Sequence, residues 1–323
     1  LNVIPLSDPL DTIVNKIKFY EFQADKILKE FEIDVVINFG DIPIRTKLPQ
    51  VYYFDWPYAV YRDFRIWRTM PVREILMMGL KLLYMSSRMS YANAVVAQTS
   101  TMRARLEEYY QGVNASVVSI GYDSIEYKAN DKRLLRMPFD YLFYPTAYYP
   151  HKNLEVLVPV AKLIKNNKIP IKIVLTLDGA RCGRSQAFLK EVARTGVSDV
   201  ILTIGRLDRD TLIQVFRSSS GYLTTSLMET YGLPYLEAKL LGVPILTSRT
   251  DFAYDVCGEE AIYFDPFSVD SVFKAIREFV ESEHSESSCV SPTFSEHKEK
   301  TWEEVCSDLI LIAKRACVPK KSC

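Results

Sequence analysis

The sequence predicts an α/β protein with two domains, each built around a parallel sheet. The chain has 323 residues, about twice the ~150 residues of a typical domain. In its second half, short β-branched runs alternate with helical patterns, which is typical of βαβ units. Hydrophobic residues make up 48% and charged residues 25% of the chain, as in soluble globular proteins. This composition excludes disordered, fibrous and coiled-coil proteins.

The second half gives the clearest pattern. Its predicted strands are 141–147, 171–177, 200–204, 221–225 and 244–247. Its predicted helices are 153–167, 186–195, 210–217 and 234–241. Strict alternation of this kind predicts a doubly wound α/β domain. We expect this domain to span residues 138–295, with an exposed loop over 281–295, followed by a C-terminal helix and tail over 296–323.

The first half is less regular but indicates a second α/β unit over residues 1–130. Its predicted strands are 34–38, 51–54, 94–97 and 115–119, and its predicted helices are 11–31 and 101–110. The polar stretch 121–138 suits the connection between the two domains.

Charge and motif content exclude several classes of function. Forty Lys and Arg residues balance forty Asp and Glu residues, so no global positive field would attract nucleic acid. The most apolar stretch, 72–91, is interrupted by charges that disfavour a membrane span. No secretion signal opens the sequence, and we expect a cytoplasmic protein. None of the three histidines has the spacing of a metal ligand, so we expect no protein-bound metal.

The most informative stretch is 226–244, whose Gly and Pro residues predict its geometry. Pro234 suits the first turn of a helix, and Gly242 suits the left-handed position after its end. The backbone N–H groups of Gly232 and Leu233 would then point out of a helix N-terminus, a favourable site for a diphosphate. Two carboxylates flank this site, and carboxylates suit sugar hydroxyls.

These carboxylates, Glu229 and Glu237, form the pattern Glu-x7-Glu, followed by Ala-Lys-Leu-Leu-Gly-Val-Pro. In this respect the chain resembles the retaining, GT-B-fold glycosyltransferases of family 4. Further pieces match that family in order: 92–100, 120–123, 150–153, 204–205 and 261–266. The resemblance covers about nine-tenths of the chain.

The resemblance implies that a sugar is transferred from a nucleotide diphosphate sugar, of UDP or GDP type, to an acceptor hydroxyl with retention. The reaction would use no metal or other cofactor, would take place in a cleft between two Rossmann-like domains, and would serve polysaccharide or glycoconjugate biosynthesis. The implied catalytic residues are Glu229, which contacts the donor sugar, and Lys152, which stabilises the leaving diphosphate. The implied donor-binding residues are Thr230, Tyr231, Gly232, Leu233, Glu237 (for the ribose hydroxyls), Gly205 and Arg206. On the acceptor side we consider Asp55 and His151.

Two other features near these residues are better explained by local structure than by a role in binding. Asn153 would cap the helix that follows Lys152. The sequence Asp208-Arg-Asp210 resembles the D-x-D by which other glycosyltransferases hold a metal, but Asp210 before Thr-Leu-Ile-Gln is better explained as a helix N-cap.

The chain departs from the family pattern in three ways. Thr146 stands where members commonly carry an Arg, and Asp55 stands in a region where many members carry a His. Only about thirty residues precede the first predicted strand, so we expect the N-terminal domain to lack its first elements. These departures favour one alternative, a non-catalytic scaffold that binds a partner glycosyltransferase. A nucleotide-sugar 2-epimerase, which shares the architecture, is another.

Residues 52–89 combine aromatic and basic side chains. One interpretation is a peripheral contact with the inner membrane leaflet, where a lipid-linked acceptor would lie. The other is that the aromatic residues form the core of the first domain and the arginines its solvated rim.

Overall fold

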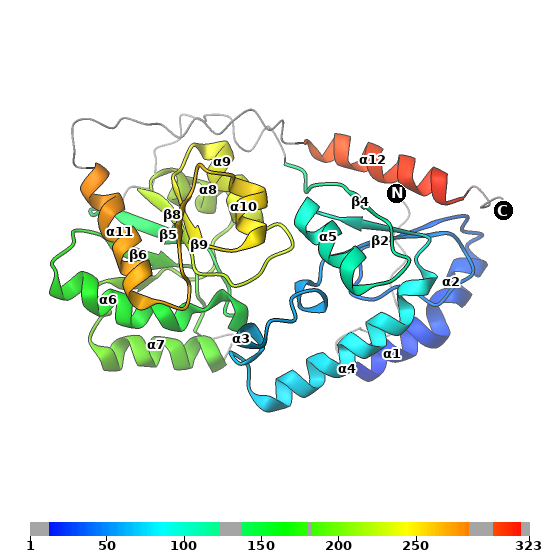
Figure 1. Cartoon of the computed structure of the whole chain (residues 1–323), viewed down its shortest axis with the longest axis horizontal. Helices are drawn as coiled ribbons and strands as arrows, with labels where there is room; N and C mark the ends of the chain where they lie inside the picture. The colour runs from blue at the N-terminus through cyan, green and yellow to red at the C-terminus, as the bar shows by residue number, and fades with distance from the viewer. Residues whose placement is uncertain (1–12, 123–136, 180–182, 284–299, 318–323) are drawn as a thin grey trace. The chain divides into compact units, whose positions relative to one another are not determined.

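The computed structural model describes residues 13–122, 137–179, 183–283 and 300–317. These residues form two compact α/β units (Figure 1). Unit 1 contains the described residues 13–60, 72–119 and 302–317, and unit 2 contains those within 61–71 and 120–301. The segment 61–71 therefore belongs to a different unit than the predicted boundaries imply, and the C-terminal helix, which was predicted as a separate part, belongs to unit 1.

Unit 1 is built on a four-stranded parallel sheet in the order β1-β2-β3-β4. The strands are β1 (Val36–Asn38), β2 (Gln50–Tyr53), β3 (Ala94–Ala97) and β4 (Ala115–Val117). Each lies within two residues of the predicted strand. The helices are α1 (Ile13–Lys18), the π-helical η1 (Phe19–Gln23), α2 (Ala24–Glu30), the short η2 (Pro57–Ala59) and η3 (Met89–Tyr91), α4 (Val72–Arg88), α5 (Ser100–Tyr109) and α12 (Trp302–Ala316). The single helix predicted over 11–31 is thus interrupted by a π-helical turn.

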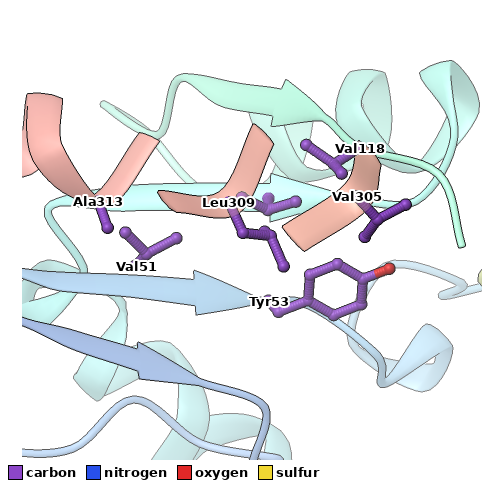
Figure 2. Packing of buried hydrophobic residues seen from close by; sticks show 7 residues of the cluster. Val51, Tyr53, Val118, Val305, Leu309 and Ala313 are labelled. Carbon is purple, nitrogen blue, oxygen red and sulfur yellow. The ribbon is translucent and has the colours of Figure 1, made fainter. Parts of the chain in front are cut away.

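Helix α12 packs on the sheet of unit 1 (Figure 2). Val305, Leu309 and Ala313 are spaced four residues apart, so they lie on one helix face. They form a buried cluster with strand residues that include Val51 and Tyr53. The chain thus returns to its first unit at its C-terminal helix, although that helix follows unit 2 in sequence.

Unit 2 is built on a six-stranded parallel sheet in the order β10-β9-β8-β5-β6-β7. The strands are β5 (Tyr141–Tyr144), β6 (Lys172–Leu175), β7 (Ile201–Thr203), β8 (Gly221–Thr224), β9 (Ile245–Ser248) and β10 (Ile262–Phe264). From β5 the chain proceeds outward to β6 and β7, then returns to place β8 on the other side of β5. The order of the strands therefore reverses between β5 and β8, and doubly wound sheets bind ligands at this switch point.

The helices of unit 2 confirm the predicted alternation. They are α3 (Phe64–Trp67), the short η4 (Pro150–Lys152) and η5 (Leu154–Val156), α6 (Leu157–Asn166), α7 (Gly183–Thr195), α8 (Arg209–Arg217), α9 (Leu233–Leu241), α10 (Asp251–Cys257) and α11 (Val269–Glu283). Helices α10 and α11 were not expected from periodicity. Most of the loop predicted over 281–295 lies outside the described residues.

The segment 61–71 joins unit 2 through specific contacts. The Tyr61 hydroxyl donates a hydrogen bond of 2.9 Å to the Asp251 carboxylate, and its ring meets the edge of Phe252. The Arg65 guanidinium lies 5.0 Å from the centre of the Phe267 ring. These contacts explain why a segment between two parts of unit 1 packs with unit 2.

The aromatic residues of the 52–89 stretch mostly form core. Trp56, Tyr58 and Tyr61 are buried, which corrects the interpretation of these side chains as an interface. Phe64 is exposed. Among the helices of the described residues, none is long and apolar enough to cross a bilayer.

Candidate active site

The predicted catalytic pair lies at the switch point of the unit 2 sheet. Lys152 ends η4, the turn that follows β5, and Glu229 lies in the loop that follows β8. Because β5 and β8 are parallel neighbours, both loops leave the same edge of the sheet. This explains how residues far apart in sequence reach one site.

Hydrogen bonds to backbone carbonyls hold the Lys152 turn against the extension of β8. The Thr225 hydroxyl donates to the Lys152 carbonyl at 2.8 Å, and the Leu227 N–H donates to the His151 carbonyl at 2.8 Å. The Tyr144 hydroxyl donates to the Lys152 carbonyl at 3.1 Å. The turn is therefore fixed from two strands before any ligand binds.

His151 directly precedes Lys152 in η4, so an imidazole lies in the same turn as the predicted catalytic pair. Burial, reinforced by the nearby Lys152 ammonium and opposed by the Glu229 carboxylate, lowers the pKa of His151 to about 4. The His151 ring stacks on Tyr149 with 5.6 Å between ring centres, and Tyr149 is exposed. At neutral pH this histidine is uncharged and can donate or accept a hydrogen bond.

Lys152 and Glu229 form an ion pair with 2.5 Å between Nζ and Oε1. The two side chains are only 18% and 14% exposed. Ser226 donates a second hydrogen bond to the same carboxylate oxygen at 2.7 Å. Burial opposes both charges, but the attraction within the pair outweighs it, so the pKa of Lys152 is raised and that of Glu229 is lowered. Both groups are charged at neutral pH.

Asn153 is not the helix cap that the sequence predicts. It adopts the left-handed conformation at a φ of 51° between η4 and η5, and its side chain makes no capping hydrogen bond. Its amide instead donates to the Pro266 carbonyl at 2.8 Å. The side chain therefore ties the Lys152 turn to the loop before α11, and α6 begins only after a further short turn.

Helix α9 is bounded by the two glycines that the sequence analysis predicts for an anion site. Gly232 precedes its first residue with a φ of 84°, and Gly242 follows its last residue with a φ of 65°. A Cβ atom at Gly232 would lie 2.7 Å from the Tyr235 ring and 3.4 Å from Cγ of Glu229. Leu233, the first residue of α9, is exposed. Only glycine therefore fits between the Glu229 loop and the start of the helix.

Glu237 has a partner that the sequence analysis missed. Its carboxylate is 3% exposed and pairs with the guanidinium of Arg209, the first residue of α8. No motif indicates this pair, because the two residues lie 28 positions apart on different helices. Thr230 and Tyr231, two of the predicted donor-binding residues, are buried in the loop before α9.

Gly205 and Arg206 follow β7, one of the two edge strands of the described sheet. Gly205 has a φ of 71°, and a Cβ atom there would meet open space. Arg206 is exposed. The structure gives neither residue a contact with the Lys152 and Glu229 pair, so their donor-binding role stays a prediction.

The D-x-D sequence caps a helix, but through its first aspartate. Asp208 is the N-cap of α8 and accepts hydrogen bonds from the Thr211 N–H at 2.9 Å and the Thr211 hydroxyl at 2.7 Å. The assignment of Asp210 as the cap is therefore wrong, since Asp210 already lies within the first turn of α8. Among the described residues, no three His, Cys, Asp or Glu side chains gather as metal ligands would.

Two of the three departures from the family pattern, Thr146 and Asp55, have structural partners of their own. Thr146 is buried and its N–H donates to the Thr176 hydroxyl at 2.8 Å. Asp55 belongs to unit 1, follows β2 and accepts a hydrogen bond of 2.9 Å from Gln98. Asp55 is exposed, so its carboxylate is accessible.

Comparison with known proteins identifies the family. Residues 128–292, just over half of the chain, match the family described as "Glycosyl transferases group 1". The chain belongs to the group 1 glycosyltransferases. The matched region contains β5 to β10 and therefore the whole Lys152 and Glu229 site.

One curated relative that the chain matches is the O-antigen chain mannosyltransferase B of Escherichia coli. The two are 23% identical over 170 residues, which make up 53% of this chain and 44% of that enzyme. The match thus spans less than half of the relative's length.

Solved glycosyltransferase structures share the fold over nearly the whole chain. A glycosyltransferase from Rickettsia africae ESF-5 superposes with a TM-score of 0.69 at 12% identity, covering 99% of this chain and 85% of that one. The Anabaena protein HepE, solved in complex with UDP and glucose, has a TM-score of 0.60 at 14% identity, covering 91% of this chain and 76% of that one. The predicted GT-B class of α/β fold is confirmed.

Proposed function

We propose that this group 1 glycosyltransferase moves a sugar from a nucleoside diphosphate sugar to an acceptor hydroxyl, with retention of the anomeric configuration, in glycoconjugate biosynthesis. The ion pair of Lys152 and Glu229 at the switch point is the observation that carries the proposal. Family membership supports the reaction class, and the complex of HepE with UDP and glucose supports the donor class.

The pair supplies the two functions that glycosyl transfer needs. Negative charge develops on the diphosphate as the bond to the sugar breaks, and a preorganised cation and backbone N–H groups stabilise that charge. Lys152 supplies the cation, and the start of α9 at Gly232 and Leu233 supplies N–H groups. Glu229 keeps Lys152 charged, and its carboxylate can accept hydrogen bonds from hydroxyls of the donor sugar.

Glu237 suits the ribose of the donor. A carboxylate can accept hydrogen bonds from two neighbouring hydroxyls, and the Arg209 guanidinium keeps this buried carboxylate in one position. The ionised form is stabilised by its partner, so it need not be neutralised on burial. Glu237 would therefore hold the nucleotide while Lys152 and Glu229 act at the reacting bond.

Two groups are candidates for orienting the acceptor. His151 is neutral and lies next to Lys152, so its imidazole can exchange a hydrogen bond with a sugar hydroxyl. Asp55 offers an exposed carboxylate on unit 1.

The experiment is an assay of nucleoside diphosphate release from UDP- and GDP-hexoses, with and without simple hexoside acceptors. We expect release from one nucleotide class, acceleration by an acceptor, and a product whose anomeric proton coupling in NMR matches that of the donor. Lys152→Met should reduce the rate about 10²- to 10³-fold, by analogy with the loss of one transition-state hydrogen-bond donor.

Two outcomes would support the alternatives. An epimerase would convert the nucleotide sugar with no acceptor present and form no glycoside. A scaffold protein would release no nucleoside diphosphate under any of these conditions, and its Lys152→Met variant would behave like the wild type.

A further inference from the structure

Unit 2 contains a cavity of about 540 Å³ whose lining residues differ from those assigned to the donor. It lies between α6 and α7, two helices that pack side by side (Figure 1). Thr69 and Pro71 of the segment 61–71 form a further wall, and all of the lining residues belong to unit 2. The volume falls within the range of about 300–1,000 Å³ that is typical of small-molecule sites.

The cavity lies at the same edge of the sheet as the pair of Lys152 and Glu229. Its lining residue Tyr148 belongs to the loop that follows β5, and Arg184 lies at the start of α7, which follows β6. Because β5 and β6 are parallel neighbours, these connections leave the edge where doubly wound sheets bind ligands. The Tyr148 hydroxyl donates a hydrogen bond to the Glu155 carboxylate. This bond spans the turn that carries Lys152, so one wall of the cavity is continuous with that turn.

The lining combines an apolar surface with polar groups that bind hydroxyls. Val158 and Phe188 are buried and supply the apolar surface, against which the C–H side of a sugar ring can pack. Glu155 and Glu191 supply carboxylate oxygens that accept hydrogen bonds, and Arg184 supplies N–H groups that donate them. A sugar hydroxyl both donates and accepts hydrogen bonds, so it can use each of these groups.

The charges around the cavity balance. Glu191 receives two hydrogen bonds of 2.7 Å from the Arg194 guanidinium, and the carboxylate has lone pairs for further donors. Arg184 offsets the second lining carboxylate, that of Glu155. A phosphate or a second nucleotide would therefore gain no net attraction here, whereas an uncharged ligand needs none.

We propose that this cavity binds an uncharged sugar unit of the acceptor, away from the hydroxyl that receives the new sugar. The inference rests on the proposed function and specifies its substrate class as an acceptor of two or more sugar units. One sugar cannot fill the cavity and also present its hydroxyl at the Lys152 and Glu229 pair. Binding of the remote unit would hold the reacting hydroxyl in position, as interactions with non-reacting parts of a substrate do.

The test is binding of neutral trisaccharides of glucose, galactose or mannose, measured by saturation-transfer NMR and titration. Each is measured without nucleotide and again with saturating UDP or GDP. The test variant is Ala187→Trp, which places a large side chain in the cavity, because Ala187 is exposed on α7 and lines it. The matched control is Ala193→Trp, at an exposed position of the same helix outside the lining. Both variants should unfold at the temperature of the wild type.

We expect at least one trisaccharide to bind the wild type and Ala193→Trp equally, and to bind Ala187→Trp at least tenfold more weakly. Glu155→Ala should also weaken binding, because it removes two acceptor oxygens. In the transfer assay, Ala187→Trp should raise KM for that trisaccharide at least tenfold and leave KM for the nucleotide sugar unchanged. This difference separates the cavity from the donor site.

The proposal is overturned if no trisaccharide binds the wild type under any of these conditions, or if Ala187→Trp binds as tightly as Ala193→Trp. Failure of the proposed function looks different. A protein that binds the trisaccharide in the cavity but releases no nucleoside diphosphate from any nucleotide sugar would overturn the proposed function and the acceptor role, but not the sugar site.

Discussion

Lys152 and Glu229 pair directly although 77 positions separate them in the sequence. The pair exists because β5 and β8 are parallel neighbours where the order of the strands reverses. Burying either the Lys152 ammonium or the Glu229 carboxylate alone would be costly, but as a pair both groups stay charged. The site is thus assembled by the topology of the sheet before a nucleotide binds.

The first prediction concerns the stability of this pair. Lys152→Met should lower the free energy of unfolding by about 1–3 kcal/mol, because it leaves the mostly buried Glu229 carboxylate without its cation. The double variant Lys152→Met with Glu229→Gln should recover part of this loss. Urea unfolding of the four proteins in the cycle measures the coupling. Additive effects of the two substitutions would contradict the ion pair.

The second prediction concerns Gly232. Gly232→Ala should destabilise the protein and weaken nucleotide binding, because the added Cβ meets the Tyr235 ring in a left-handed backbone conformation. Gly205→Ala is the matched control, since Gly205 has a similar φ but open space around it. The control should cost only the backbone strain, about 1 kcal/mol. Thermal unfolding of both variants tests this, and equal losses would contradict the steric explanation.

The third prediction concerns pH. The pKa of His151 is about 4 in the folded protein and about 6.5 in the unfolded chain. The unfolded chain therefore binds more protons between these values, and stability falls as pH decreases from 6.5 toward 4, by at most about 3 kcal/mol. His151→Gln should remove this part of the decline. Urea unfolding across this pH range measures it, and an unchanged slope in the variant would refute the assignment.

The fourth prediction concerns α12 and unit 1. Leu309→Ala should lower the free energy of unfolding by about 2–5 kcal/mol, because it opens a cavity against β2. Leu311→Ala, on the exposed side of the same helix, should change it by less than about 0.5 kcal/mol. Chemical denaturation compares the two. Similar losses would show that α12 does not pack on the sheet as described.

Local sequence patterns predicted the strands and several helices well. The strand at Ala94–Ala97 and the alternation in unit 2 follow from β-branched runs and from Gly and Pro residues at the ends of elements. These signals act over only a few residues. The same patterns could not show that α12 packs on unit 1, or that 61–71 packs on unit 2. Which unit a segment packs on depends on contacts between residues that are distant in the sequence, such as Tyr61 with Asp251.

The candidate site was predictable where it rests on a motif. Glu229 and Lys152 were identified through the resemblance, and the structure brings them together. Arg209 was missed because its partner Glu237 lies on another helix. Asn153 was misassigned because it adopts the left-handed backbone conformation rather than the extended one of a helix N-cap, and its amide donates to the distant Pro266 carbonyl.

The most direct test of the central claim is calorimetric titration of the protein with UDP, GDP and ADP. One nucleotide should bind, and Glu237→Ala should weaken it at least tenfold. Asp210→Ala, an exposed carboxylate next to Arg209, is the matched control and should bind like the wild type. If no nucleotide binds, or if the Glu237→Ala variant binds as tightly as the wild type, the donor site is not the one described.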